Sequence, residues 1–471
     1  MKRLLLHIFI FATGILSAQT RTGSIALDSL PSDLPLPSIT TLKSPAEGYI
    51  FAAVPYWGTG RAYLVVYNNQ GRPVFFRKTP STCTDFKLHE NGLFTYFDYA
   101  AKKFFALDST FAVVDSFWVQ NGFSTDEHEI KLLRNGNVLL IGNGYRFYDM
   151  SQIVAGGDRN ASVVVNVVQE IDRTRRVVFE WKAFEKYKLT DVGPGVNLRD
   201  LAFVHTHLNS IDFDLDSNLI VSSRNLDEIT KIDRKSGEII WRLGGKNNQF
   251  TFLNDTVGLS AQHSATILPN GHLLLFDNGN SHTPHFSRAV EYRLDQTAKT
   301  ATLVWSYRNT PDVASIFWGN AQRLKNGNTF ISWGKNNIAA TEVDAKGEKV
   351  FEMTFPADVF SYRIFRFPPN LMTIVAKVDG SNVATEFSLE QNYPNPFNAR
   401  SVIRYRLSRM GFVELDVFDV LGRKVTSLVQ DVRDAGVHTV AWDGSAFSSG
   451  IYVYRLRMNG SSATRPMILL K

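Results

Sequence analysis

Hydrophobic and polar residues alternate along residues 46–375 in short runs that are separated by turn residues. The clearest unit is GLSAQHSATILPNGHLLLFDNGN at 258–280, where two apolar runs flank an Asn-Gly dipeptide. Apolar runs joined by Asn-Gly are typical of β-hairpins. The pattern therefore predicts antiparallel strands throughout this part of the chain.

The same hairpin recurs. Copies begin near Thr84, His128, Asn209, His263 and Gly319. All have Asn-Gly at the turn except the third, which has Asp216-Ser217. The segment at 361–369 resembles a further inner strand, which the strands at 48–78 would complete, leaving no free sheet edge. Repeats of this kind indicate a radial fold. We predict an all-β chain with a six-bladed β-propeller at 46–375, with five or seven blades as alternatives.

The flanking segments differ in character. Residues 1–18 have a basic start, an apolar run and small residues at their end, which predicts a signal peptide; the alternative, a membrane anchor, needs a longer run. Residues 19–45 form an extended lead-in rich in Ser, Pro and Thr. After a linker at 376–386, residues 387–471 contain short alternating runs with Gly and Pro, which predicts a small C-terminal β-sandwich.

Composition narrows the classes of function. The 471 residues are 44% hydrophobic, enough for a large core without disulfides, and the single cysteine, Cys83, is expected to be a structural thiol. The net charge of +6 falls to about +4 without Lys2 and Arg3, and the basic residues are scattered. No nucleic-acid partner is therefore expected. The chain also has no Gly-rich phosphate loop that would hold a nucleotide.

The register of the repeats is the main functional signal. His128, Asn209 and His263 each precede their turn by seven residues, and His207 lies two residues before Asn209 on the same predicted strand face. Equivalent positions in a propeller lie on one ring around the axis. Arg224 and Asn278 follow the second strands at equivalent offsets. We therefore predict a pocket lined by His128, His207, Asn209, Arg224 and His263.

Other interpretations of these residues remain open. His205 and His207 could form a metal-ligand pair, although Arg224 would repel a cation and no carboxylate joins them in register. Arg224 could pair with Asp227, and Asp277 and Asn278 could be turn formers. The remaining histidines are expected to be structural: His89, His272, His282, His285 and His438.

Two regions resemble known families. The motifs DEHEI at 126–130, HLNS at 207–210, VSSR at 221–224, IIWRLGG at 239–245, QHSA at 262–265 and FDNG at 276–279 resemble those of bacterial arylsulfate sulfotransferases. The C-terminal motifs NYPNPFN at 392–398, VFDVLG at 417–422, AGVHTVAWD at 435–443 and SGIYVY at 449–454, with the final Lys471, resemble the sorting domain of proteins exported by the type IX secretion system.

The first resemblance implies a secreted enzyme that moves a sulfuryl group from an aryl sulfate donor to a phenolic acceptor, with no cofactor and no metal. Carried onto this chain, it implies that His263 becomes sulfated. His128, His207, Asn209 and Arg224 would then hold the sulfuryl oxygens and handle the phenol proton. The chain departs from the family at 319–322, where GNAQ replaces a hydroxyl residue. The alternative is a non-catalytic surface propeller that binds anionic aromatic compounds or sulfated glycans.

The second resemblance implies a route through the periplasm and across the outer membrane. The partner on that route is the type IX secretion machinery, and the destination is the cell surface or the medium. Removal of the C-terminal domain is common in the family. The sequence of this domain shows no arrangement of residues that would indicate a catalytic site.

Overall fold

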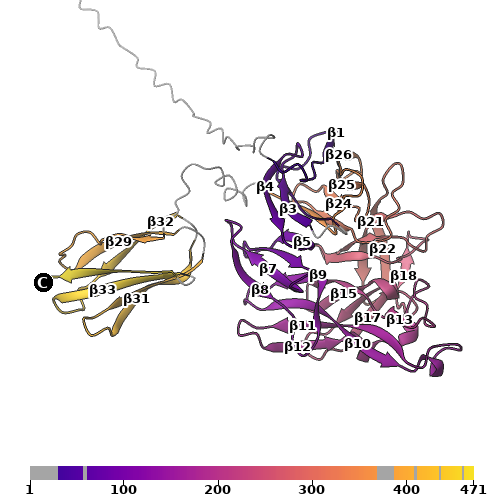
Figure 1. Cartoon of the computed structure of the whole chain (residues 1–471), viewed down its shortest axis with the longest axis horizontal. Helices are drawn as coiled ribbons and strands as arrows, with labels where there is room; N and C mark the ends of the chain where they lie inside the picture. Colours follow the sequence, from indigo (N-terminus) through magenta and orange to yellow (C-terminus); the bar gives the residue numbers. More distant parts are fainter. Residues whose placement is uncertain are drawn as a thin grey trace, which may run out of the picture.

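The computed structural model describes residues 30–56, 61–368, 387–407, 411–433, 436–458 and 461–470. The predicted signal peptide (1–18), the first part of the lead-in (19–29) and the predicted linker (376–386) lie outside the described residues. The described chain is almost entirely β-structure, in agreement with the alternating pattern (Figure 1).

Six sheets form the propeller, and each contains a core of four antiparallel strands. The innermost strands, in chain order, are β5 (Cys83–Leu88), β9 (Ser124–Leu132), β14 (Leu208–Phe213), β19 (His263–Ile267), β23 (Asn320–Arg323) and β27 (Ile364–Phe367). The second strands are β6 (Phe94–Asp98), β10 (Val138–Tyr148), β15 (Leu219–Ser223), β20 (Leu273–Asp277), β24 (Thr329–Ser332) and β2 (Tyr49–Tyr56). The third strands are β7 (Lys103–Leu107), β11 (Ala161–Ile171), β16 (Glu228–Ile232), β21 (Arg288–Asp295), β25 (Ile338–Val343) and β3 (Arg61–Tyr67). The fourth strands are β8 (Val113–Phe117), β12 (Val177–Lys182), β17 (Ile239–Gly244), β22 (Thr300–Tyr307), β26 (Lys349–Thr354) and β4 (Pro73–Thr79).

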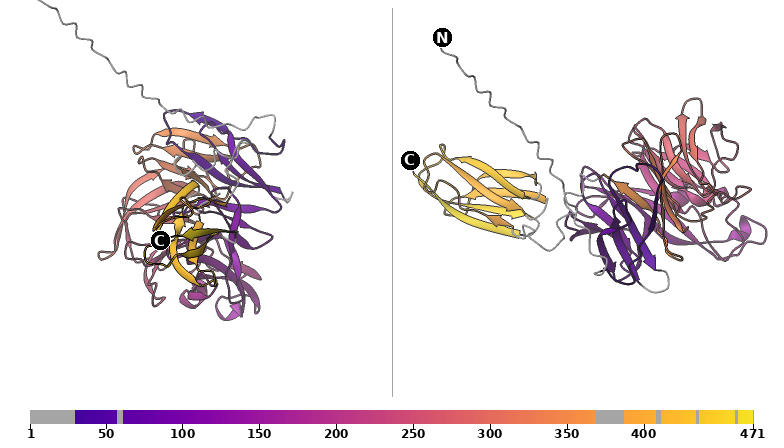
Figure 2. Two further views of the ribbon diagram at one scale, coloured as in Figure 1. Left: turned by 90° about the vertical axis from the view of Figure 1, so that its left-hand side faces the viewer. Right: turned by 90° about the horizontal axis from the view of Figure 1, so that it is seen from above.

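The ring closes by joining the end of the propeller to its beginning. β27 pairs with β2 in one sheet, with Tyr49 opposite Phe367. Neighbouring inner strands contact one another all the way round, from β5 to β27 and back to β5. The first and last propeller strands accordingly lie side by side in Figures 1 and 2. The prediction of six blades with circular closure is confirmed, and the alternatives of five or seven blades are excluded.

The turns explain why the Asn-Gly signal works. The third residue of each inner turn has a positive φ, which glycine adopts at little cost. Gly92, Gly136, Gly271 and Gly327 have φ between 79° and 88°, and each donates a backbone hydrogen bond across its turn. Ser217 takes the same place in the third blade with φ of 67°. The turn that lacks Asn-Gly in the sequence therefore has the same backbone geometry.

Buried tryptophans tie neighbouring blades together. Trp181 on β12 donates from Nε1 to the Gly237 carbonyl of the next blade at 3.0 Å. Trp241 on β17 donates in the same way to Gln296 at 3.1 Å. Both rings are buried against apolar clusters, so the indole nitrogen is satisfied while the ring packs. The tryptophan at the end of the predicted outer strand thus holds the next blade in place.

Several elements were not predicted. β1 (Ser38–Thr41) lies in the lead-in and adds an outer strand to the sheet of β23–β26 by pairing with β26. Two further strands, β13 (Ala202–Val204) and β18 (Thr251–Leu253), add in parallel to other sheets. The α-helix α1 (Ala183–Lys186) is one turn long. None of the helices in the described ranges is both long and apolar enough to span a bilayer.

The C-terminal domain is a two-sheet β-sandwich, as predicted. One sheet has the order β28 (Ser388–Leu389), β29 (Arg400–Leu407), β32 (Gly436–Asp443), and the other has the order β31 (Lys424–Arg433), β30 (Gly411–Phe418), β33 (Gly450–Met458), β34 (Ser461–Leu469). The inner faces bury a separate apolar cluster that includes Trp442, Tyr454 and Leu456. The domain therefore has a core of its own.

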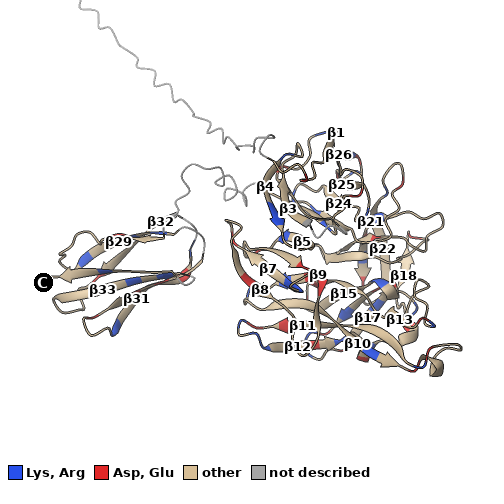
Figure 3. Cartoon of the chain, in the orientation of Figure 1, with Lys and Arg blue, Asp and Glu red and all other residues tan. Residues whose placement is uncertain are grey.

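Charged residues are spread over both domains rather than gathered on one face. Figure 3 shows Lys and Arg interleaved with Asp and Glu along the propeller strands. Cys83 is fully buried in the apolar cluster between the first blades, and this burial raises the pKa of its thiol to about 12. The expectation of a structural, unreactive cysteine fits this environment.

Candidate active site

Three histidines from consecutive blades meet on the axis, at the end of the inner strands away from the Asn-Gly turns. The Nε2 atoms of His128 and His207 lie 3.3 Å apart, and the His263 ring centroid lies 6.4 Å from each of the other two rings. His128 and His263 are no more than 5% exposed. The structure thus brings together three of the five predicted pocket residues as a buried cluster.

The three histidine side chains are directed toward the axis by local irregularities of the backbone, and not by the regular alternation of side chains along a strand. The pairing of β9 with β10 shifts between Thr125 and Ile130, so the segment that holds His128 bulges from the sheet. A second shift follows His263, where Ser264 has φ of 55°. His207 precedes β14 and has φ of 52°. The prediction that His207 and Asn209 share a strand face is therefore wrong; a left-handed residue turns His207 toward the axis instead.

Asn278 fixes the orientation of His263. The Asn278 amide nitrogen donates to the carbonyls of Ser315 at 2.8 Å and Trp318 at 3.0 Å, so its Oδ1 must face His263 Nδ1, 2.7 Å away. A carbonyl oxygen can only accept, so Nδ1 carries the hydrogen in the neutral ring. The Nε2 lone pair is then free. Asn278 is the first residue after β20, as Arg224 is after β15.

The surroundings of His128 favour its protonated form instead. Its Nδ1 lies 2.6 Å from Asp126 Oδ1, and Asn143 donates to the other oxygen of the same carboxylate at 2.7 Å. Burial opposes protonation of His128, but the carboxylates of Asp126 and Glu127 outweigh it and raise the pKa. An imidazolium at His128 can donate from Nε2 toward His207. The cluster therefore contains one proton donor held by a carboxylate.

The other two histidines are held neutral. Burial, with help from the charges of His128 and Arg224, lowers the pKa of His207 to about 3. Burial, followed by Arg224, His128 and His207, lowers the pKa of His263 well below its usual value. Cationic neighbours thus favour an unprotonated imidazole at His263, which a nucleophile requires.

Arg224 lies beside the cluster with unused hydrogen-bonding capacity. Its Nη1 donates to Asn225 at 2.9 Å and its Nη2 to the Ile316 carbonyl at 3.2 Å, while the Phe317 ring lies 5.5 Å from the guanidinium carbon. Its Nε is buried and has no hydrogen-bond partner among the described residues. Asp227 accepts from the Ala261 amide instead of pairing with Arg224. The ion-pair alternative is not what the geometry favours.

Asn209 is fully buried, and its contacts differ from the expected role. Its Nδ2 donates to the Gln262 carbonyl at 2.8 Å, and its own backbone carbonyl accepts from Arg363 at 2.6 Å. The Asn209 Oδ1 is buried without a partner in the described part of the chain. One Nδ2 hydrogen is therefore used to join two blades.

The geometry also bears on the alternative of a metal site and on the role of Asp277. His205 lies outside the three-histidine group and its Nε2 contacts the Lys188 carbonyl at 3.0 Å, so it does not form a ligand pair with His207. The ligand atoms of His128, His207 and His263 do lie within 4.8 Å of one another, a spacing that a metal ion would also accept. The nearby charge of Arg224, however, favours an anion over a cation. Asp277 accepts from Ser260 and Arg288 and so supports the loop rather than the pocket.

Three residues around the cluster escaped the sequence analysis as site residues. Asp126 stands two residues before His128, an acid–histidine spacing that could have been noticed. The equivalent offsets of Asn278 and Arg224 do not by themselves indicate that Asn278 faces His263. Tyr362 packs its ring 5.4 Å from His128 and donates to the His128 carbonyl at 3.2 Å. Only the ring closure brings Tyr362 to the axis, so no local signal predicts it.

Comparisons with known proteins agree with this architecture. The sequence profile of the arylsulfotransferase (ASST) family matches residues 58–366. The profile of the secretion system C-terminal sorting domain matches residues 391–470. No curated protein matches the chain.

Solved structures resemble the chain only distantly. A protein of unknown function from Bacteroides caccae has 14% identity and a TM-score of 0.43, covering 68% of this chain and 99% of that one. A catalytically inactive virginiamycin B lyase from Staphylococcus aureus, bound to quinupristin, has 10% identity and a TM-score of 0.37, covering 78% of this chain and 94% of that one.

The family match covers more than half of the chain and contains every residue of the three-histidine cluster. The sorting domain directs export across the outer membrane, to the cell surface or the medium, through the type IX secretion machinery. The protein therefore belongs to the arylsulfotransferase family and carries a C-terminal secretion sorting domain.

Proposed function

We propose that this protein transfers a sulfuryl group from an aryl sulfate to a phenol, with His263 as the group that carries it. The observation that supports this most is the pairing of His263 with Asn278, which leaves the His263 Nε2 lone pair free in a site with positive charge on both sides. A neutral nucleophile beside cations suits an anionic donor.

In the first half-reaction, His263 Nε2 attacks the sulfur of the donor. An N–S bond forms as the bond between sulfur and the phenolic oxygen breaks. The leaving phenolate takes a proton from the His128–His207 pair, whose Nε2 atoms are 3.3 Å apart. A general acid with a pKa near neutrality matches this step.

In the second half-reaction, the acceptor phenol occupies the place of the product. Its hydroxyl proton returns to the same histidine pair, its oxygen attacks sulfur, and the N–S bond breaks. Charge on the sulfuryl oxygens is similar in both transition states, so one set of donors serves both. The unpartnered Arg224 Nε and the second Nδ2 hydrogen of Asn209 are candidates for these contacts.

The aromatic body of the substrate has a candidate surface next to Arg224. Ile316 and Phe317 are 47% and 40% exposed, unusual for such side chains, and they border the guanidinium. An aryl ring placed on them would leave its sulfate facing Arg224. Apolar walls with a few polar anchors are common in small-molecule sites.

Turnover of a chromogenic aryl sulfate, with and without added phenol, tests the proposal. We expect release of the coloured phenol to be much faster when an acceptor is present, and to be insensitive to a metal chelator. Tight binding of the aryl sulfate without turnover would contradict the proposal. That outcome would favour the alternative of a non-catalytic surface propeller for anionic aromatic or sulfated ligands.

The pH dependence should be one-sided. His263 must be neutral, which its lowered pKa allows well into the acid range, and His128 must be protonated, which its raised pKa allows to higher pH. We expect kcat/KM to stay level as pH falls through histidine's ordinary pKa of about 6.5 and to decline on the alkaline side. A profile of kcat/KM from about pH 4 to about pH 9 checks this.

The variant Asn278→Asp allows a comparison of the pH profile of kcat/KM with that of the unmodified protein. A carboxylate opposite His263 Nδ1 would raise the pKa of His263, so an acidic limb should appear at higher pH than in the unmodified protein. An acidic limb at about pH 6.5 already present in the unmodified protein would contradict the assignment of His263 as a buried neutral nucleophile.

Removal of residues 387–471 should leave the chemistry unchanged. The sandwich buries its own core, and every group of the proposed site comes from the propeller. We expect the shortened chain to keep its kcat/KM and its thermal unfolding transition but to be retained by cells that export the full chain. A folded, soluble truncation without turnover would show instead that the sandwich contributes to the site.

A further inference from the structure

A cavity opens at the end of the propeller axis opposite the three-histidine cluster. It encloses about 860 Å³ and is lined by the turn ends of the inner strands, including Leu133 and Leu268, whose carbonyls accept the turn hydrogen bonds. None of the three clustered histidines is among its lining residues. The cavity is therefore distinct from the site of the proposed sulfuryl transfer.

A layer of side chains separates the two. Tyr362 packs against His128 on one side, and the guanidinium of Arg363 lies 4.7 Å from the centroid of the Tyr362 ring on the other. Arg363 lines the cavity, where it pairs with Glu129 at 3.0 Å. Going along the axis, the order is His128, Tyr362, Arg363 and then the cavity. A ligand in the cavity would meet the floor formed by Arg363 and its neighbours.

Cations outnumber carboxylates in the lining. Six lysine and arginine side chains face three acids: Lys87, Lys131, Arg134, Arg234, Arg323 and Arg363 against Glu90, Glu129 and Asp212. Four of these cations also pair with acids outside the lining: Lys87 and Arg363 with Asp85, Arg234 with Glu170, and Arg323 with Glu291. Lys131 and Arg134 pair with the lining acids Asp212 and Glu90. Burial raises the pKa of Asp85 against the pull of Lys87 and Arg363.

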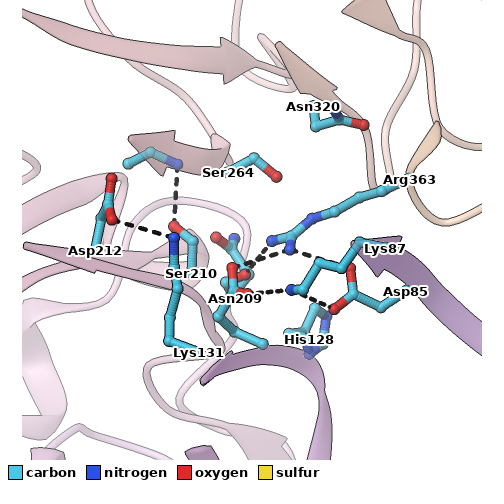
Figure 4. Close-up of polar contacts among 12 residues, drawn as sticks. Asp85, Lys87, His128, Lys131, Asn209, Ser210, Asp212, Ser264, Asn320 and Arg363 are labelled. Carbon is cyan, nitrogen blue, oxygen red and sulfur yellow. Dashed lines mark hydrogen bonds and ion pairs between the residues drawn. The ribbon is translucent and has the colours of Figure 1, made fainter. Parts of the chain in front are cut away.

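Hydrogen-bond donors without a partner indicate that a ligand of this cavity would be negatively charged. Asn320 is 1% exposed; its Oδ1 accepts from the Ile364 amide, while its Nδ2 has no partner among the residues described. The Nε atoms of Arg323 and Arg363 are likewise buried and unpartnered within the described ranges. In Figure 4, Asn320 stands without a contact to the other side chains drawn, beside the paired Lys87, Arg363 and Asp85. Unpaired buried donors are costly, and an anion would satisfy them.

The upper walls are apolar. Phe213, Phe365 and Phe367 line the cavity, together with Leu132 and Ile267. An inorganic anion would use only the floor, whereas an anion with an aromatic or aliphatic body would also cover these side chains. We propose that this turn-side cavity is a second binding site, for an organic anion that places its charged group on the floor near Asn320 and Lys131.

Benzenesulfonate is a suitable probe because its C–S bond makes it no donor for sulfuryl transfer. The titration uses the full chain with Arg224→Met, which removes the main cation of the histidine site, and follows heat of binding. We expect saturable binding with one site per chain. We expect inorganic sulfate to bind about tenfold more weakly or worse, because it lacks the apolar body.

Three variants in this background test the location. Asn320→Asp keeps the acceptor for Ile364 but places negative charge where the free donor was, and Lys131→Gln removes one floor cation; each should weaken binding about tenfold or more. Asn135→Asp makes the same charge change at the exposed mouth and should alter binding less than about twofold. If Asn320→Asp fails to fold, Lys131→Gln still tests the location of the site.

Three results would overturn the assignment. The first is absence of saturable benzenesulfonate binding. The second is an affinity for inorganic sulfate equal to that for benzenesulfonate. The third is a loss of benzenesulfonate affinity in Asn135→Asp as large as that in Asn320→Asp and Lys131→Gln. None depends on turnover, so failure of the proposed transferase activity would be seen separately.

Discussion

Replacement of His263 by alanine should abolish aryl sulfate turnover, with a loss of at least about a thousandfold in kcat. The imidazole has its Nδ1 bound to Asn278 and its Nε2 directed to a site flanked by Arg224 and His128. The other two imidazoles of the cluster are placed differently: His128 is paired with Asp126, and the Nε2 of His207 lies 3.3 Å from that of His128. Steady-state rates with a chromogenic aryl sulfate measure the loss.

The covalent intermediate gives this prediction a second readout. Brief incubation with an aryl sulfate and no acceptor should add the mass of one sulfuryl group to the peptide that contains His263. The digest must stay neutral or basic, because an N–S bond of this kind is labile in acid. The adduct should be absent from His263→Ala and should form more slowly in His207→Ala.

His272→Ala is a matched control for the nucleophile. His272 is also a histidine at the edge of an inner hairpin in the same blade, but its Nδ1 pairs with Glu291 away from the three-histidine cluster. This variant should keep both turnover and the adduct. Full activity in His263→Ala, or an adduct on a different peptide, would end the assignment of His263.

Arg224→Lys should lower kcat by about two orders of magnitude or more. Lysine keeps the charge but loses the planar fork, and with it the Nε that is buried and unpartnered in the described structure. The loss should appear in kcat more than in KM, because the oxygens gain charge in the transition state. Thermal unfolding should change little, because among the described residues the side-chain hydrogen bonds of Arg224 go only to Asn225 and a loop carbonyl.

Arg175→Lys provides the comparison. Arg175 also lies near aromatic rings, 4.9 Å from Phe117, and it pairs with Asp115. It lies in the turn between β11 and β12, the two outer strands of the His128 blade, and not among the residues of the three-histidine cluster. Its replacement should leave kcat unchanged. If Arg224→Lys lowered the melting temperature and left kcat intact, Arg224 would be a structural residue.

The propeller could be predicted because its signals are local and repeated. Each Asn-Gly turn reports a residue with positive φ, and the short apolar runs on both sides report the strands. Repetition then set the number of blades, and the segment at 361–369 suggested the closing strand that β27 and β2 form. Copies of one register also predicted that His128, His207 and His263 would converge, although their separation in the sequence is large.

What could not be predicted depends on departures from that regularity. The bulges in β9 and β19 and the left-handed His207 are single-residue changes of backbone, and alternation gave the wrong face for His207. Asn209 looked like a free donor, but one of its hydrogens joins two blades. The protonation of His128 depends on Asp126 and on burial, which only the folded structure provides.

The closing strand also affects when the propeller can complete its folding. Arg366 donates to the carbonyl of Ala46, a residue 320 positions away in the chain. Until the last propeller residues are available, β2 has no partner along its inner edge, and an unpaired edge invites association with other strands. Closure of the ring therefore has to wait for nearly the whole propeller, as expected for a topology with such distant contacts. A newly synthesised chain would need protection at β2 in that interval, and the same edge is where premature aggregation during export should begin.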